Sequence, residues 1–188
     1  MLMQREKKTD GGYTALHHAV THNQKEIAGL LISRGADVHV KQNVGMTPLF
    51  GASKEMTHLL INAGADVNAQ DDTLDAPLLH AMMLGLKETA KLLVSNGADI
   101  NIKGFNGRTP LFQAVTRPNN AIVNDIERSS KEMTEFIIAA GADVNAQNGD
   151  GKTPLDFTTD GFFADEEIAE LLRKRGGKTA EELKAERE

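Results

Sequence analysis

The feature that most constrains this chain is a short phrase that recurs along it. The clearest copy reads GADVNAQ from Gly64, and its relatives are GADVHV from Gly35, GADINI from Gly97 and GADVNAQ from Gly141. Each copy follows an apolar run with the spacing of a helix. A chain that repeats one unit in this way is predicted to form a stack of small similar units, and not one central core.

A second phrase recurs in step with the first. It reads TALH, TPLF, APLL, TPLF and TPLD, and its copies begin at Thr14, Thr47, Ala76, Thr109 and Thr153. The intervals between these starting residues are 33, 29, 33 and 44 residues. The period is therefore regular, apart from one shortened unit and one lengthened unit.

The two phrases together predict how each unit folds. In the second phrase, Thr commonly caps a helix N-terminus and Pro suits the first helical position. In the first phrase, Gly ends the preceding helix because it adopts the left-handed conformation at low cost, and the Asp and Asn after it favour a turn. Each unit is predicted to be two short antiparallel helices and a turn, which can bury its apolar face only against neighbouring units.

The phrases and their period resemble those of the ankyrin-repeat family, over roughly residues 9–178. The resemblance implies an all-α fold, an ankyrin-repeat solenoid of helix pairs joined by β-hairpin-like turns. It also implies that His17, the phrase histidine, ties neighbouring hairpins together through hydrogen bonds. We expect one domain over 1–188, with repeats at about 9–41, 42–70, 71–102, 103–146 and 147–177 and a polar capping helix at 178–188.

Three repeats depart from the pattern. Repeat two is four residues short after TPLFGAS, so its first helix should be clipped. In repeat three, Leu74 replaces the usual turn Gly, so we expect this hairpin tip to differ from its neighbours. Repeat four is eleven residues longer than the period, with the extra stretch at about 117–128, and residues 129–132 have the pattern of a capping box that starts its second helix. The insertion is either a loop packed back on its own repeat or a protrusion that contacts a partner.

The two ends of the repeat series differ. Residues 1–8 contain no helix-pair pattern, so the first repeat lacks an upstream cap. Three interpretations are open: a frayed tail, a chain cut from a longer protein, or a surface that another chain covers. We expect weak self-association through this N-terminal repeat. The ending GGKTAEEL is similar to that of many bacterial proteins of the family.

Composition narrows the classes of function. The net charge is −6 and the pI about 5.5, which argues against a nucleic-acid partner. The chain has no Cys, hence no thiolate chemistry and no Cys-ligated zinc. It has no apolar run of the roughly 18 residues that a membrane helix needs, and its start lacks the apolar stretch of a signal peptide. We therefore expect a cytoplasmic protein with no membrane contact.

Motifs that could carry chemistry are incomplete. Gly177-Lys178-Thr179 lacks the upstream Gly of a phosphate-binding loop. His18 and His22 lie four residues apart, but the sequence offers no evident third metal ligand. No Ser/His/Asp arrangement is visible. We therefore predict no catalysis, no cofactor and no metal, and an enzyme or metal-binding protein built on the stack is the alternative from another class.

The resemblance implies that partners dock on a concave surface made of hairpin tips and first helices. We predict a non-catalytic scaffold for a protein partner, or a fragment that recruits targets for a larger protein, and a structural spacer is a further alternative. The predicted partner-binding residues are Tyr13, His22, Val44, Met46, Asp75, Met83, Leu84, Phe105, Arg108, Arg117 and Lys152. Four of them are apolar at places expected to be exposed: Tyr13, Met46, Leu84 and Phe105. Such residues form an interface or are scattered singly, and we favour the interface.

Overall fold

The computed structural model describes residues 8–116, 125–159 and 164–188. Every regular element in these ranges is a helix, which confirms the predicted all-α class. Two compact units are present, unit 1 ending at Ala98 and unit 2 beginning at Asp99. The arrangement of all five repeats as one domain stays a prediction.

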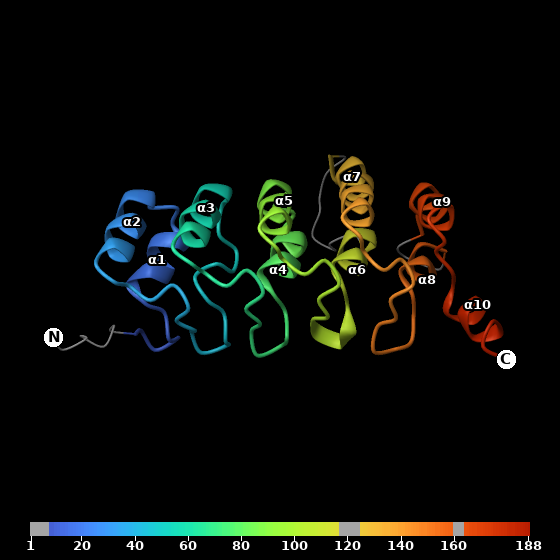
Figure 1. The fold of residues 1–188 in the computed structure, drawn as a ribbon, viewed down its shortest axis with the longest axis horizontal. Coiled ribbons are helices and arrows are strands. Elements are labelled where there is room, and N and C mark those ends of the chain that lie inside the picture. The colour runs from blue at the N-terminus through green and yellow to red at the C-terminus, as the bar shows by residue number, and fades with distance from the viewer. Residues whose placement is uncertain (1–7, 117–124, 160–163) are drawn as a thin grey trace. The chain divides into compact units, whose positions relative to one another are not determined.

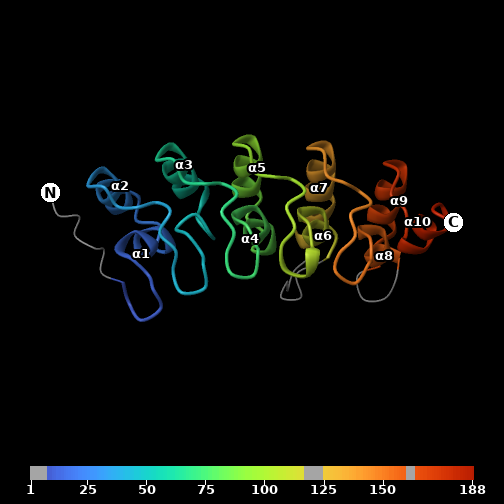
Figure 2. The same cartoon turned by 60° about the horizontal axis from the view of Figure 1, so that its bottom comes forward.

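Unit 1 contains α1 (Ala15–Thr21), α2 (Lys25–Ser33), α3 (Lys54–Asn62), α4 (Pro77–Met83) and α5 (Lys87–Ser95) (Figure 1). Helices α1 and α2 pack as a pair, as do α4 and α5, and α3 packs against both α2 and α5. Within this unit, α2, α3 and α5 lie in one layer while α1 and α4 lie in another (Figure 2).

Repeat two contributes one helix where its neighbours contribute two. Residues 48–51 form turns, and the chain then runs directly into α3, capped by the Ser53 hydroxyl. The missing four residues amount to about one helical turn. A first helix such as α1 has only seven residues, or about two turns, so this loss leaves too few residues for a helix. The predicted clipping of this helix is confirmed.

Unit 2 contains the short 3-10 turn η1 (Phe105–Gly107), α6 (Pro110–Val115), α7 (Asp125–Ala139), α8 (Pro154–Thr159), α9 (Glu166–Lys174) and α10 (Ala180–Ala185). Helix α6 packs on α7 and α8, and α9 packs on α7 and α8. The predicted start of α7 at residues 129–132 is wrong, because the helix already begins at Asp125 and that capping pattern lies inside it. A local capping preference is weak when the residues before it can extend the same helix. The rest of the insertion, residues 117–124, lies outside the described residues.

The GAD phrase ends the last helix of repeats one to four, as predicted. After α2, Gly35 adopts φ +88°, and the N–H of Ala36 donates to the carbonyl of Leu31 at 3.0 Å. After α3, Gly64 adopts φ +89° and Ala65 bonds back to Leu60 in the same way. These bonds satisfy carbonyls that the helix end would otherwise leave unpaired.

The Asp and Asn of the same phrase have separate tasks. The carboxylate of Asp66 accepts the backbone N–H of Asn68 at 2.9 Å and so closes the turn locally. The Asn68 side chain then donates to the carbonyl of Gly97, at the end of the next repeat, at 3.1 Å. In unit 2, the Asn145 amide reaches Gly176 in the same way at 3.0 Å. The phrase therefore folds one turn and links it to the next.

Each unit has an apolar interior built from the Leu of the second phrase and from the inner face of the second helices. In unit 1 the fully buried side chains include Leu16, Leu49, Leu60, Leu78 and Leu93. In unit 2 they include Leu111, Phe112, Ile137, Leu155 and Leu172. These interiors fix the helices from which the turns between repeats project.

Candidate functional site

The candidate site is built on five turns, each of which precedes a TPL-like phrase. We call them tips one to five, and they are residues 9–13, 42–46, 71–75, 104–108 and 148–152. In each tip the first N–H donates to the last carbonyl, at 2.9 to 3.0 Å. Because this bond closes the turn, each tip presents its side chains from a fixed backbone.

Tips within one unit are also bonded to each other. In unit 1, the N–H of Asn43 donates to Gly11 at 3.0 Å, and the N–H of Asp72 donates to Val44 at 3.1 Å. In unit 2, the N–H of Gly149 donates to Asn106 at 2.7 Å. The approach is close, since a Cβ on Gly12 would lie 2.4 Å from Oδ1 of Asn43. The tips of a unit therefore form one continuous backbone edge.

His17 ties repeat one to tip two, as the resemblance implied. Its Nδ1 accepts the backbone N–H of Thr14 at 3.2 Å, so the proton is on Nε2, which donates to the carbonyl of Met46 at 3.3 Å. Burial of the imidazole lowers the pKa of His17 below its ordinary value and so favours the neutral ring.

Three large apolar side chains project from the tips of unit 1. Tyr13 is 37% exposed, Val44 50% and Leu74 58%. The ring of Tyr13 also lies 5.6 Å from each of the His17 and His18 rings, which covers part of it. Tyr13 is thus exposed as predicted, and Val44, one of the predicted binding residues, is exposed as well.

The predicted exposure of Met46 is wrong, because this residue is half-buried. Its carbonyl accepts hydrogen bonds from both Gln42 and His17, which hold the residue against repeat one. Asp75, the corresponding residue of tip three, is also half-buried. In tips two and three, the residue directly before the phrase is therefore less accessible than Val44 and Leu74.

Leu74 belongs to this surface but is absent from the predicted binding residues. It adopts φ +68°, a left-handed conformation in which the other four tips have Gly. A side chain in this conformation costs about 1–2 kcal/mol relative to the right-handed region. The sequence could have indicated this residue, because a Leu in place of a turn Gly is expected to be both strained and exposed.

The predicted residues at the ends of the first helices are exposed where they are described. Met83 is 48% exposed and Leu84 is 52% exposed. His22 is exposed, and its Nδ1 lies 2.9 Å from the His18 carbonyl, to which Nδ1–H donates. Arg117 lies outside the described residues.

Unit 2 brings together two predicted cations. The guanidinium carbon of Arg108 and the ammonium of Lys152 each lie 5.9 Å from the centroid of the Phe157 ring. The Arg108 guanidinium also donates to the hydroxyl of Thr116 at 2.9 Å. Phe105, in the same tip as Arg108, is 67% exposed. Phe157, which the sequence did not single out, is the ring that joins tips four and five.

The described residues contain no group of three or more His, Cys, Asp or Glu side chains that could hold a metal ion. The rings of His18 and His22 are stacked with centroids 6.4 Å apart. Among the described helices, none combines the length and the apolar composition that crossing a bilayer requires.

Comparison with known proteins gives two further findings. A family model of ankyrin repeats in three copies matches residues 49–126, and a model of the single ankyrin repeat matches residues 11–43 and 106–149. An ankyrin repeat-containing protein of the yeast Schizosaccharomyces pombe is 36% identical over 45 residues, which make up 24% of this chain and 22% of that protein. The matched part thus spans about a fifth of the length of this relative.

Proposed function

Since this chain belongs to the ankyrin-repeat family, whose members are general protein–protein interaction modules, we propose that it binds a protein partner without catalysing a reaction on it. The observation that carries the proposal is the edge of bonded tips in unit 1. That edge holds Tyr13, Val44 and Leu74 in fixed positions, with much of each side chain exposed.

The backbone bonds support binding because they reduce its cost. Tips one to three are each closed internally, and each is bonded to the next. Binding therefore orders little backbone that is not already ordered, which leaves more of the interaction energy as affinity. The buried centre of an interface is more apolar than its polar rim, so exposed apolar side chains on such a frame suit that centre.

The strained backbone of Leu74 is a second support. A Gly at this position would relieve the left-handed strain, and four of the five tips have Gly there. A side chain kept at a cost in stability is typical of a functional position. We assign Leu74 to the partner-binding surface together with Tyr13 and Val44.

Unit 2 would supply a different contact. Phe105 offers an exposed apolar ring, and Arg108 and Lys152 place positive charge over Phe157. This combination suits a partner segment in which a carboxylate lies beside an apolar side chain. His22, Met83 and Leu84, at the first-helix ends of unit 1, would extend the contact of that unit.

The test uses a partner captured from cells, purified and then titrated by calorimetry. The combined variant Tyr13→Ser, Val44→Ser and Leu74→Gly is expected to weaken binding at least tenfold, since each loses an exposed apolar contact worth about 1 kcal/mol or more. The matched control replaces Glu55, His58 and Asn62 by Ser, all exposed on α3. Both variants should keep the helical circular dichroism of the parent. Equal affinity of the tip variant and the parent would refute the proposal.

A second candidate is that the chain recruits targets for a larger protein. It is favoured by the yeast relative, in which the matched part is about a fifth of the length. The two candidates share the same surface, and we propose a cytoplasmic location for either. Fusing the chain to a reporter enzyme and measuring delivery to the captured partner would test the recruiting role, which fails if delivery is unchanged by the tip variant.

A further inference from the structure

The outer face of α2 is apolar and uncovered in unit 1. Ile27 is 48% exposed and Leu30 is 55% exposed, although both belong to a helix in a packed pair. Leu31, between them and the interior, is only partly buried. These residues share one side of the helix, since they lie three or four positions apart.

The same position in the other second helices is buried. Ile27 lies eight residues before the Gly that follows its helix, and its counterparts are Met56 in α3, Thr89 in α5, Met133 in α7 and Ile168 in α9. These counterparts are 0%, 4%, 7% and 1% exposed. The residue four positions later behaves alike, because Leu31 is half-buried while Leu60, Leu93, Ile137 and Leu172 are fully buried.

The reason for the difference is the preceding helix. In unit 1, α3 packs on α2 and α5 packs on α3, and the hydroxyl of Thr89 on α5 donates to the carbonyl of Ala52 in the repeat before it. A second helix of this unit therefore turns this side toward the repeat before it. Residues 8–33 provide no earlier second helix for α2. The face of Ile27, Leu30 and Leu31 is thus shaped to receive another helix.

The other end of the chain cannot supply that helix. Helix α10 buries none of its residues, and its side chains include Glu181, Glu182 and Lys184. It is joined to the repeat before it by polar contacts, among them Arg173 with Glu182 and the Ala180 N–H with the Asp156 carboxylate. An apolar face has no complement on such a surface, so head-to-tail association of copies is disfavoured.

We propose that two copies of this chain pair through their α2 faces, about a two-fold axis near Leu30. A two-fold arrangement is self-complementary and closes after two copies. With this axis perpendicular to the helices, the two α2 helices are antiparallel, and Leu30 meets Leu30 of the second copy. Glu26 and Arg34 lie four residues on either side of Leu30, on the same side of the helix. Each Glu26 is therefore placed opposite Arg34 of the other copy, which adds charge complementarity to the apolar contact.

The size of the face sets the strength of the dimer. One helix face buries less than the roughly 800 Å² per partner of a standard stable interface. The dimer is therefore weak and concentration-dependent. It leaves the tips free, so it is compatible with partner binding.

The first experiment measures the mass of the full chain in solution by sedimentation, over a wide range of concentration. The parent is expected to shift from monomer to dimer as concentration rises. The Ile27→Glu, Leu30→Glu variant should remain monomeric, and it should still fold because both side chains are about half exposed. The matched control, Met83→Glu with Leu84→Glu, changes an equally exposed apolar pair in the same unit and should still dimerise.

The second experiment tests the antiparallel register. Glu26→Arg and Arg34→Glu should each weaken the dimer about threefold to tenfold, and the double variant should restore it, because the pair is re-formed with its charges exchanged. The chain has no Cys, so Leu30→Cys introduces a single thiol. That variant should oxidise to a disulfide-linked dimer, whereas Met83→Cys should not.

A parent that stays monomeric at all concentrations overturns the proposal. So does a dimer that survives Ile27→Glu with Leu30→Glu, or one abolished by the Met83 and Leu84 control. A chain that dimerises only after residues 1–7 are removed also overturns it, and would make that segment the occupant of the α2 face. Because the tip variant should still dimerise, failure of this proposal is distinguishable from failure of the proposed function.

Discussion

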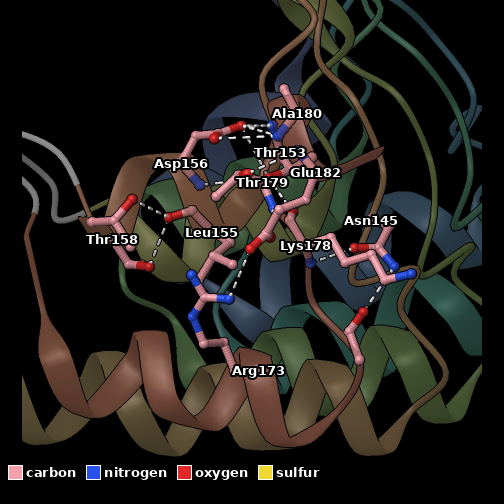
Figure 3. Close-up of polar contacts among 12 residues, drawn as sticks. Asn145, Thr153, Leu155, Asp156, Thr158, Arg173, Lys178, Thr179, Ala180 and Glu182 are labelled. Atoms are coloured by element: carbon pink, nitrogen blue, oxygen red, sulfur yellow. Dashed lines mark hydrogen bonds and ion pairs between the residues drawn. The ribbon is translucent and has the colours of Figure 1, made fainter. Parts of the chain in front are cut away.

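Replacing Asp156 by Ala should release α10 before the rest of unit 2 unfolds. The Asp156 carboxylate accepts the Thr153 N–H at 2.7 Å and the Ala180 N–H at 3.1 Å (Figure 3). Thr153 caps α8, and Ala180 is the first residue of α10. One carboxylate therefore stabilises the start of two helices.

The magnitude follows from these bonds. The loss of the capping interaction at Thr153 costs about 1 kcal/mol. The loss of a hydrogen bond to a charged group costs about 1.5–3 kcal/mol, and since Asp156 is only half-buried we take about 2 kcal/mol for the bond to Ala180. The second cost falls on α10 alone. Two neighbouring bonds at Lys178 remain, to Thr153 and to Asn145, but α10 has no buried side chain to hold it in place.

Amide hydrogen exchange separates the two costs. The amides of Leu183 and Glu186 bond within α10, to Thr179 and Glu182, and they exchange when this helix opens. A cost of about 2 kcal/mol accelerates their exchange about 30-fold in Asp156→Ala. The control is Asp66→Ala, which removes a turn acceptor in unit 1 and should leave α10 unchanged. Exchange of the α10 amides at the parental rate in Asp156→Ala would refute this account.

Three other predictions concern the repeats themselves. Burial lowers the folded-state pKa of His17, so the unfolded chain binds more protons than the folded chain below pH about 6.5. The free energy of unfolding should therefore fall as pH is lowered from that value toward the folded pKa. Urea unfolding at several pH values should show a smaller dependence of this free energy on pH in His17→Phe. Leu74→Gly should raise the free energy of unfolding by about 1 kcal/mol while weakening partner binding, and a loss of stability would show that Leu74 is unstrained. Gly64→Ala should destabilise the protein by about 1 kcal/mol or more because Gly64 has φ +89°, whereas Gly29→Ala inside α2 should stabilise it by a similar amount. Neither added Cβ meets another atom within 4 Å, so changes in stability of the same sign in thermal unfolding would contradict the backbone explanation.

The features that the sequence predicted correctly depend on residues close in the chain or at a fixed interval within the repeat period. The Gly after α2 ends the helix through hydrogen bonds that all lie among residues 30–36. The loss of the first helix in repeat two follows from a count of residues against one helical turn. The role of His17 was correct because its partner, Met46, lies at a fixed interval within the repeat period.

The features that the sequence did not predict depend on what covers a residue. Ile27 and Met56 occupy the same position of the same pattern, yet one is 48% exposed and the other 0%. The local sequence pattern cannot distinguish these two residues, because their burial depends on whether another helix precedes their own. Met46 shows the converse, because a residue expected at an exposed place is half-buried by its contact with repeat one. The residues predicted to bind a partner therefore remain a prediction, while the backbone that presents them was foreseeable.

In repeats one and five, the fourth residue of the TPL-like phrase is matched to the element that follows the repeat. His17 and Asp156 both accept the N–H of their own phrase Thr. Beyond that, His17 faces a carbonyl of the next tip and donates to it, whereas Asp156 faces the N-terminus of a helix and accepts from it.

Asp156→His should separate these two tasks. The imidazole can still accept from the Thr153 N–H, as His17 does from Thr14, so about 1 kcal/mol of capping is retained relative to Asp156→Ala. Its other nitrogen carries a proton and offers no acceptor to Ala180, so α10 should exchange as fast as in the Ala variant. Urea unfolding measures the retained stability and hydrogen exchange measures the release. An α10 that stays protected in Asp156→His would show that the carboxylate does not hold this helix.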